Sequence, residues 1–107
     1  MKFVKTMSIL SSLLWLSQSQ PAAGLDGKAL YTAKKCHTCH GADGSKPLVP
    51  TYPKIAGQNA PYLEAQMKDI RDGKRNNGLS VAMKPFTMGL TDAEIKAIAK
   101  FLNGVKK

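Results

Sequence analysis

Cysteine and histidine are scarce in this chain of 107 residues, which contains two of each. All four lie in one short stretch, CHTCH, which runs from Cys36 to His40. A structural disulfide explains this stretch poorly, because a bridge between Cys36 and Cys39 would close too small a loop to constrain the unfolded chain much. A zinc site would need a further pair of cysteines or histidines, which the sequence does not provide.

A long hydrophobic run is also missing. The longest apolar stretch, MSILSSLLWL (residues 7–16), has about half of the roughly 20 residues that a membrane-spanning helix needs. It follows the basic residues Lys2 and Lys5 and precedes the small and polar residues SQSQPAAG, an order typical of a secretory signal peptide. We therefore expect residues 1–24 to be a signal peptide and residues 25–107 to form one exported domain with no stable membrane span.

Acidic residues are few, with seven Asp and Glu against sixteen Lys and Arg and a formal net charge of +9. Removing residues 1–24 removes two lysines and no acidic residue, so the remaining domain has fourteen basic against seven acidic residues, or +7. Nucleic acid is not the expected partner, because the sequence has no basic stripe interleaved with aromatic residues. The expected partner is a protein with an acidic surface.

Patterns of β-strands are weak throughout, whereas three segments predict helices: residues 26–35, 59–73 and 91–104. The segments between them, residues 40–58 and 74–89, are rich in glycine and proline and predict irregular loops. The expected fold class is therefore all-α, with three or more helices separated by long loops.

Apolar spacing and capping residues carry the prediction for two of these helices. Leu63, Met67 and Ile70 recur at i, i+4 and i+7, which places them on one face and predicts that Met67 packs in the core. Thr91 and Glu94 form a capping box at the start of the last helix. A domain of about 83 residues buries only a modest core, so we expect a cofactor, metal or disulfide to stabilise it.

The stretch CHTCH places Cys36, Cys39 and His40 at i, i+3 and i+4, so a helical turn would direct both sulfurs and one imidazole to the same side. Two cysteines at this spacing can form thioethers with the vinyl groups of a haem while the adjacent histidine binds the iron, and the motif predicts covalent haem attachment. A thioredoxin-like dithiol pair is the alternative, but it belongs in a strand-helix-strand context that is missing here. His37, between the cysteines, is expected to be exposed.

Three further stretches match one known family: CHGADGS, YPKIAGQNAPYLEAQMKDIRDGKR, and a methionine seven residues before LTDAEI. Through them the chain, from about Gly27 to Leu102, resembles class I cytochromes c of the small bacterial periplasmic type. It is similar to the single-haem halves of diheme c-four cytochromes and to the haem subunits of flavocytochrome sulfide dehydrogenases. The resemblance implies a small cytochrome c fold, with long loops wrapped around one covalently attached haem c.

The resemblance also implies that His40 and a methionine bind the haem iron. Family members place this methionine in the loop before the last helix, seven residues ahead of the leucine that precedes the helix cap. That position is Met83, and Met88 is the alternative. A proline carbonyl in the first loop is expected to accept a hydrogen bond from the imidazole of His40. Pro50 is the first choice for this proline and Pro53 the alternative.

Further residues follow from the same resemblance. Gly27 and Tyr31 resemble the family's Gly-x-x-x-aromatic pattern in the first helix, and ordinary packing against the last helix explains them equally well. Five lysines lie in segments that could surround the exposed haem edge and attract an acidic redox partner, namely Lys34, Lys35, Lys46, Lys54 and Lys84.

The function implied is one-electron transfer in the periplasm, with iron cycling between Fe(II) and Fe(III), and the chain itself is not expected to be an enzyme. The alternative is a haem-bearing subunit of a larger oxidoreductase, such as a flavocytochrome sulfide dehydrogenase. The expected state is accordingly a monomer or one subunit of a heteromeric redox complex.

Overall fold

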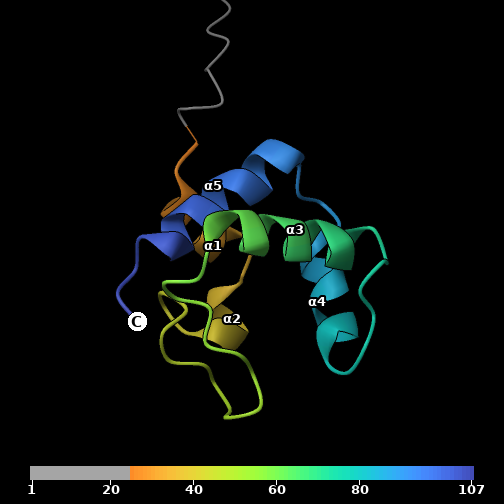
Figure 1. Ribbon diagram of the computed structural model, residues 1–107, viewed down its shortest axis with the longest axis horizontal. Coiled ribbons are helices and arrows are strands. Elements are labelled where there is room, and N and C mark those ends of the chain that lie inside the picture. The colour runs from red at the N-terminus through yellow and green to blue at the C-terminus, as the bar shows by residue number, and fades with distance from the viewer. Residues whose placement is uncertain (1–24) are drawn as a thin grey trace, which may run out of the picture.

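The computed structural model describes residues 25–107, and within this range it contains five α-helices and no β-strand. The helices are α1 (Gly27–Ala33), α2 (His37–His40), α3 (Ala60–Arg71), α4 (Ser80–Thr87) and α5 (Asp92–Asn103) (Figure 1). The prediction of an all-α fold is confirmed. Over residues 25–107, no helix combines the length and the apolar character that crossing a membrane requires. The predicted signal peptide lies outside the described residues.

Side-chain caps define where the three predicted helices begin. The Asp26 carboxylate accepts hydrogen bonds from two backbone N–H groups in the first turn of α1, and the Asn59 side chain accepts one in the first turn of α3. At α5, the Thr91 hydroxyl accepts from the N–H of Glu94 while the Glu94 carboxylate accepts from the N–H of Thr91. Each cap contributes about 1 kcal/mol by pairing donors that the helix leaves free.

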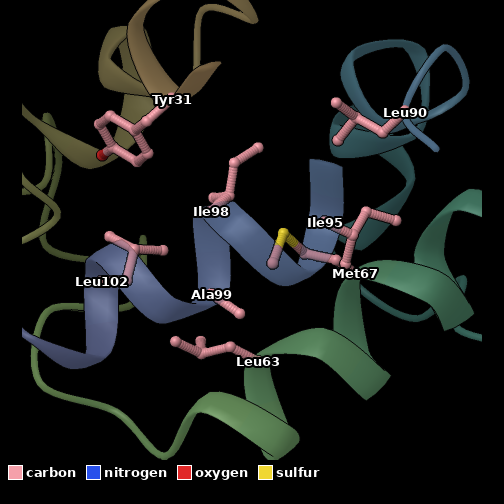
Figure 2. Close-up of a cluster of buried hydrophobic side chains, with 8 residues drawn as sticks. All are labelled: Tyr31, Leu63, Met67, Leu90, Ile95, Ile98, Ala99 and Leu102. Atoms are coloured by element: carbon pink, nitrogen blue, oxygen red, sulfur yellow. The ribbon is translucent and has the colours of Figure 1, made fainter. Parts of the chain in front are cut away.

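The hydrophobic core gathers around α5, which packs against α1 on one side and α3 on the other (Figures 1 and 2). Figure 2 shows the side chains of the cluster, which are Tyr31, Leu63, Met67, Leu90, Ile95, Ile98, Ala99 and Leu102. Ile95, Ile98, Ala99 and Leu102 form the buried stripe of α5. Met67 is 9% exposed in this cluster, which confirms the prediction that it packs in the core.

A glycine allows α1 to approach α5 closely. A Cβ atom on Gly27 would clash with the backbone carbonyl oxygen of Ala97 and would lie 2.8 Å from the Cβ atom of Phe101. One helical turn further on, the ring of Tyr31 meets the ring of Phe101 edge to face, with centroids 5.5 Å apart and an angle of 60°. Gly27 and Tyr31 therefore pack against the last helix, one by having no side chain and the other by its aromatic ring.

The structure contradicts the prediction that residues 74–89 form an irregular loop, because α4 occupies most of the second half of this segment. Pro85 lies inside α4 and removes one backbone hydrogen bond. However, Leu79, Met83 and Phe86 recur at i, i+4 and i+7 and line the same cavity. These three residues give α4 an apolar face toward the cavity, although Leu79 and Phe86 remain 57% and 43% exposed.

We predict that Gly27→Ala lowers the free energy of unfolding by about 1–3 kcal/mol, because the added methyl group forces α1 away from α5. The measurement is guanidinium unfolding of the oxidised, haem-containing protein. The matched control is Gly89→Ala, at a position where a Cβ atom would meet nothing within 4 Å and φ is not left-handed. The control should stay within about 0.5 kcal/mol of the unsubstituted protein. Equal losses in both variants would contradict the close crossing.

Candidate haem site

A cavity of about 410 Å³ lies below α3, between α2 with its following loop and α4. Figure 1 shows α2 and α4 on opposite sides beneath α3. The cavity is lined by Cys36, Cys39 and His40 on the α2 side and by Met83 on the α4 side. Its lining also includes side chains of the hydrophobic core, so the cavity and the core share a wall.

The haem-attachment motif forms a single helical turn. Cys36, immediately before α2, already has helical dihedral angles, with φ −58° and ψ −35°, and its carbonyl accepts a hydrogen bond of 3.1 Å from the N–H of His40. Cys36, Cys39 and His40 therefore follow one turn, and all three line the cavity. Both cysteines are unbridged and half-buried, whereas His37 is exposed as predicted. The residues of the motif that would bind haem are thus together on one wall.

Burial raises the pKa of the Cys36 thiol above its ordinary value. The thiol is thereby kept protonated at neutral pH. A catalytic dithiol pair needs the opposite environment, because the thiolate is the nucleophile and its pKa is lowered in such sites. The surroundings of Cys36 therefore do not fit the nucleophile of a thioredoxin-like pair.

His40 is 6% exposed, and its Nδ1 atom lies 3.3 Å from the carbonyl oxygen of Pro53. When Nδ1 donates to this carbonyl, Nε2 carries no proton and is free to bind a metal. Burial lowers the pKa of His40, while the hydrogen bond to Pro53 opposes this shift in part. The neutral imidazole is thus favoured, which is the form that binds iron.

The choice of Pro50 as the hydrogen-bond partner of His40 is wrong, because the structure assigns this role to Pro53. Pro50 lies in a tight turn in which the N–H of Tyr52 donates to the carbonyl of Val49 at 3.1 Å. Pro53 directly follows this turn, where the chain comes back toward α2. The physical reason for the error is therefore the turn, which shifts the contact three residues along the loop.

The hydroxyl of Tyr31 donates a hydrogen bond of 2.7 Å to the carbonyl oxygen of Gly41, the residue that follows His40. The backbone carbonyl of Tyr31 also accepts a bond of 3.0 Å from the N–H of Cys36. Tyr31 is fully buried and lines the cavity. One residue of α1 therefore holds the motif at both ends, a role that the sequence pattern did not indicate.

We predict that Tyr31→Phe costs about 1–3 kcal/mol of unfolding free energy, because it leaves the Gly41 carbonyl without its partner while preserving the ring contact with Phe101. Guanidinium unfolding of the haem-containing protein measures this change. Tyr62→Phe is the control, since Tyr62 is 53% exposed and removing its hydroxyl leaves no buried carbonyl without its partner. If both variants unfold at the same denaturant concentration, the bond to Gly41 does not hold the motif.

The two candidate methionines differ sharply in their surroundings. Met83 is half-buried and lines the cavity from α4. Met88, just beyond the end of α4, is 64% exposed and is not part of the cavity lining. The placement therefore favours Met83 over Met88 as the residue that could reach a metal in the cavity.

The cavity also contains polar residues that the sequence analysis did not identify. Gln66, Arg75 and Asn77 line it, and Arg75 Nη1 donates to Gln66 Oε1 at 2.8 Å. Their only signal in the sequence was that Gln66 and Arg75 fall within the stretch YLEAQMKDIRDGKR. Without periodicity or a metal-ligand spacing, that stretch gave no reason to place these two side chains together.

The five lysines expected near the haem edge separate into groups. Lys35 and Lys54 line the cavity. Lys34 instead lies 3.9 Å from the Glu94 carboxylate of α5 and contributes to the contact between α1 and α5. The other two, Lys46 and Lys84, are exposed and are not part of the cavity lining.

The residues around the cavity fit a covalently attached haem. Two unbridged thiols and a neutral imidazole lie on one wall, a thioether lies on the α4 side, and buried apolar side chains complete the lining. This donor set matches the Cys, His and Met groups that hold haem in c-type proteins.

A family model for cytochrome c matches residues 25–106 of the chain. The chain belongs to the cytochrome c family. Membership implies covalently attached haem c with its iron, and the chemistry of the family is electron transfer. The prediction of a cytochrome c fold is confirmed by the solved structure described next.

Two relatives and one solved structure show the extent of the similarity. Cytochrome c-554(548) of Halomonas halodenitrificans is 46% identical over 66 residues, covering 62% of this chain and 78% of that protein. A thiosulfate dehydrogenase electron acceptor of Stutzerimonas stutzeri is 34% identical over 103 residues, covering 90% of this chain and 46% of that protein. The crystal structure of reduced recombinant cytochrome c4 from Pseudomonas stutzeri superposes with a TM-score of 0.65 at 27% identity, covering 75% of this chain and 46% of that one. The chain thus spans about half the length of the last two.

Proposed function

We propose that this protein is a periplasmic one-electron carrier in which Cys36 and Cys39 attach the haem and His40 and Met83 bind its iron. The observation that carries this proposal is the cavity, which has His40 on its α2 side and Met83 on its α4 side. The proposal includes removal of residues 1–24 on export, leaving residues 25–107 as the functional domain.

The protein groups each make a distinct contribution in this proposal. Haem c, when bound, supplies the exchange of one electron between Fe(III) and Fe(II). The Pro53 carbonyl orients His40, and the buried surroundings keep its imidazole neutral. The Met83 thioether is a neutral, soft ligand that favours the ferrous state and raises the reduction potential relative to two histidines. With His40 and Met83 both bound to the iron, the protein would leave no open position for oxygen or peroxide.

A heteromeric complex is the second candidate. In it, the chain would be the haem-bearing subunit of a larger oxidoreductase, such as a flavocytochrome sulfide dehydrogenase. The outer face of α4 supports this possibility, because Val81 is 55% exposed and Met88 is 64% exposed there. The relative named as a thiosulfate dehydrogenase electron acceptor supports the carrier instead, since its name describes a protein that receives electrons from an enzyme. Co-purification with a larger flavoprotein would favour the subunit.

We predict that Met83→Leu abolishes the near-infrared sulfur-to-iron absorption band of the oxidised protein, lowers its reduction potential, and allows carbon monoxide to bind the reduced protein promptly. The substitution conserves side-chain volume, so these changes report loss of the sulfur more than loss of packing. Absorption spectroscopy and redox titration are the measurements.

Met88→Leu is the matched control for this experiment. Because Met88 is exposed and outside the cavity, its replacement should leave the absorption band, the potential and the slow reaction with carbon monoxide unchanged. The opposite pattern, with the changes appearing in Met88→Leu, would show that Met83 is not the ligand.

We also propose that the partner is a redox protein with an acidic surface, and that Lys35 and Lys54 guide it to the cavity mouth. Both line the cavity, and neither forms an ion pair with a carboxylate in the part of the chain that the structure describes. Cationic groups at this place would attract an acidic protein to the point at which the electron leaves.

We predict that the double variant Lys35→Glu, Lys54→Glu transfers electrons to an acidic redox protein about tenfold more slowly at low ionic strength, because it reverses two charges at the mouth. Stopped-flow rates are measured over a range of salt concentrations, and the difference should shrink as salt rises. Lys96→Glu, Lys100→Glu carries the same charge change on the exposed face of α5 and is the control. Equal slowing by both double variants would attribute the effect to net charge alone.

A further inference from the structure

The helix α4, which carries Met83, has few buried contacts that hold it in place. Its buried residues are Ser80 and Thr87, whose side chains are small and polar. The large apolar residues that it directs to the cavity, Leu79 and Phe86, remain exposed. Burial of small polar side chains contributes little hydrophobic stabilisation, so other contacts are needed to fix the position of α4.

The connection from α4 to α5, residues 88–91, has one buried residue, Leu90, which also lines the cavity. The N–H of Leu90 donates to the carbonyl of Thr87 at 3.0 Å, at the end of α4. The Thr87 hydroxyl in turn lies 3.1 and 3.4 Å from the carbonyl oxygens of Lys84 and Met83 and donates to them. Hydrogen bonds therefore connect Leu90 to the backbone of Met83.

Arg71, at the end of α3, binds Leu90 from the other side. Its Nη1 donates to the carbonyl of Leu90 at 3.1 Å and to the Asp92 carboxylate at 2.7 Å. Its Nε and Nη2 donate to the two oxygens of Asp72 at 2.8 and 3.2 Å, a bidentate pair that fixes the plane of the guanidinium. The Arg71 side chain is 19% exposed and is not part of the cavity lining. Arg71 thus links the connection after α4 to α3 without reaching the cavity.

The two ends of α4 are held unequally. The helix packs against α3 and lies beneath it (Figure 1). Residues 72–79, which lead into α4, are mostly exposed, whereas Arg71 holds the segment that follows α4. A hydrogen bond from a charged donor is about twice as strong as one between neutral groups. Movement of α4 away from the cavity therefore strains the bond between Arg71 and Leu90.

We propose that Arg71 is a positioning residue for Met83, and that it slows departure of the thioether from the haem iron by holding the end of α4 against α3. This inference rests on the proposed binding of iron by Met83. When α4 moves outward, Met83 is drawn away from the iron, and the bond from Arg71 to Leu90 opposes that movement. Arg71 does not line the cavity, so its effect on ligation passes through Leu90 and α4.

The test measures how fast added imidazole replaces Met83 in the oxidised, haem-containing protein. At saturating imidazole, the rate of replacement equals the rate at which the thioether leaves the iron, and loss of the sulfur-to-iron band reports it. Arg71→Gln should raise this limiting rate about tenfold, because a hydrogen bond from a charged donor is lost. Lys68→Gln is the matched control, since it removes the same charge from α3 and breaks only the pair with Glu64. The control should leave the limiting rate unchanged.

Two comparisons separate positioning of Met83 from general loss of stability. Gly27→Ala weakens the fold where α1 crosses α5, at Ala97 and Phe101, and should leave the limiting rate unchanged. Addition of Arg71→Gln to Met83→Leu should not accelerate imidazole binding, followed at the Soret band, because no sulfur remains to be displaced. Acceleration that needs both the loss of Arg71 and the presence of Met83 identifies a positioning role.

A conservative variant covers the case in which Arg71→Gln does not accumulate with haem. Arg71→Lys keeps the charge but loses the planar fork that bonds Asp72 and Leu90 at once. It should accelerate departure of the sulfur, though less than Arg71→Gln, and its limiting rate then decides the question alone.

The proposal is overturned if the Arg71 variants have the same limiting rate as Lys68→Gln, or if Gly27→Ala accelerates departure of the sulfur as much as they do. Acceleration that persists in the Met83→Leu background would also overturn it. Absence of the sulfur-to-iron band from the unsubstituted protein would count instead against Met83 as a ligand. The two failures are therefore distinguishable in one set of samples.

Discussion

The fold depends on side chains that belong to the core and to the haem cavity at once. The shared residues are Tyr31, Leu63, Met67, Leu90, Ile98 and Leu102. A domain of this size buries a limited apolar area, and an empty cavity of about 410 Å³ would leave these residues without part of their packing. Haem binding thus contributes directly to folding stability, because a group that binds only the folded state stabilises it. The same side chains therefore pack the core of the domain and line its haem cavity.

The motif that holds haem is rigid because it is fixed from two independent directions. From the α1 side, Tyr31 bonds to the residue after His40, while on the loop side the Pro53 carbonyl holds the imidazole. Tyr31 is in turn positioned by the close crossing of α1 and α5 at Gly27. The helix crossing and the orientation of His40 are therefore linked through one tyrosine. Under the proposed ligation, such a support limits movement of the imidazole between the two oxidation states.

Local patterns were sufficient to predict the attachment motif and three helices, and they failed where the outcome depends on distant segments. The caps at Asp26, Asn59 and Thr91 act within a few residues, so the sequence alone reveals them. The sequence alone does not predict α4, because Pro85 disfavours a helix and the apolar face of α4 acquires a role only beside the cavity. The sequence did not distinguish Pro53 from Pro50 as the partner of His40, because an irregular loop has no periodicity from which its register could be deduced.

Two groups of cations have distinct roles in this basic domain. Arg71 is paired with Asp72 and Asp92 and also donates to the carbonyl of Leu90, so it joins the end of α3 to the start of α5. Lys35, Lys54 and Arg75 line the cavity without a carboxylate partner in residues 25–107. Arg71 thus holds two helices together, whereas the three cations of the cavity wall concentrate positive potential where haem binds. Under the proposed function, that potential would favour the ferrous state and attract an acidic partner, whose docking would weaken the potential and favour release of the electron.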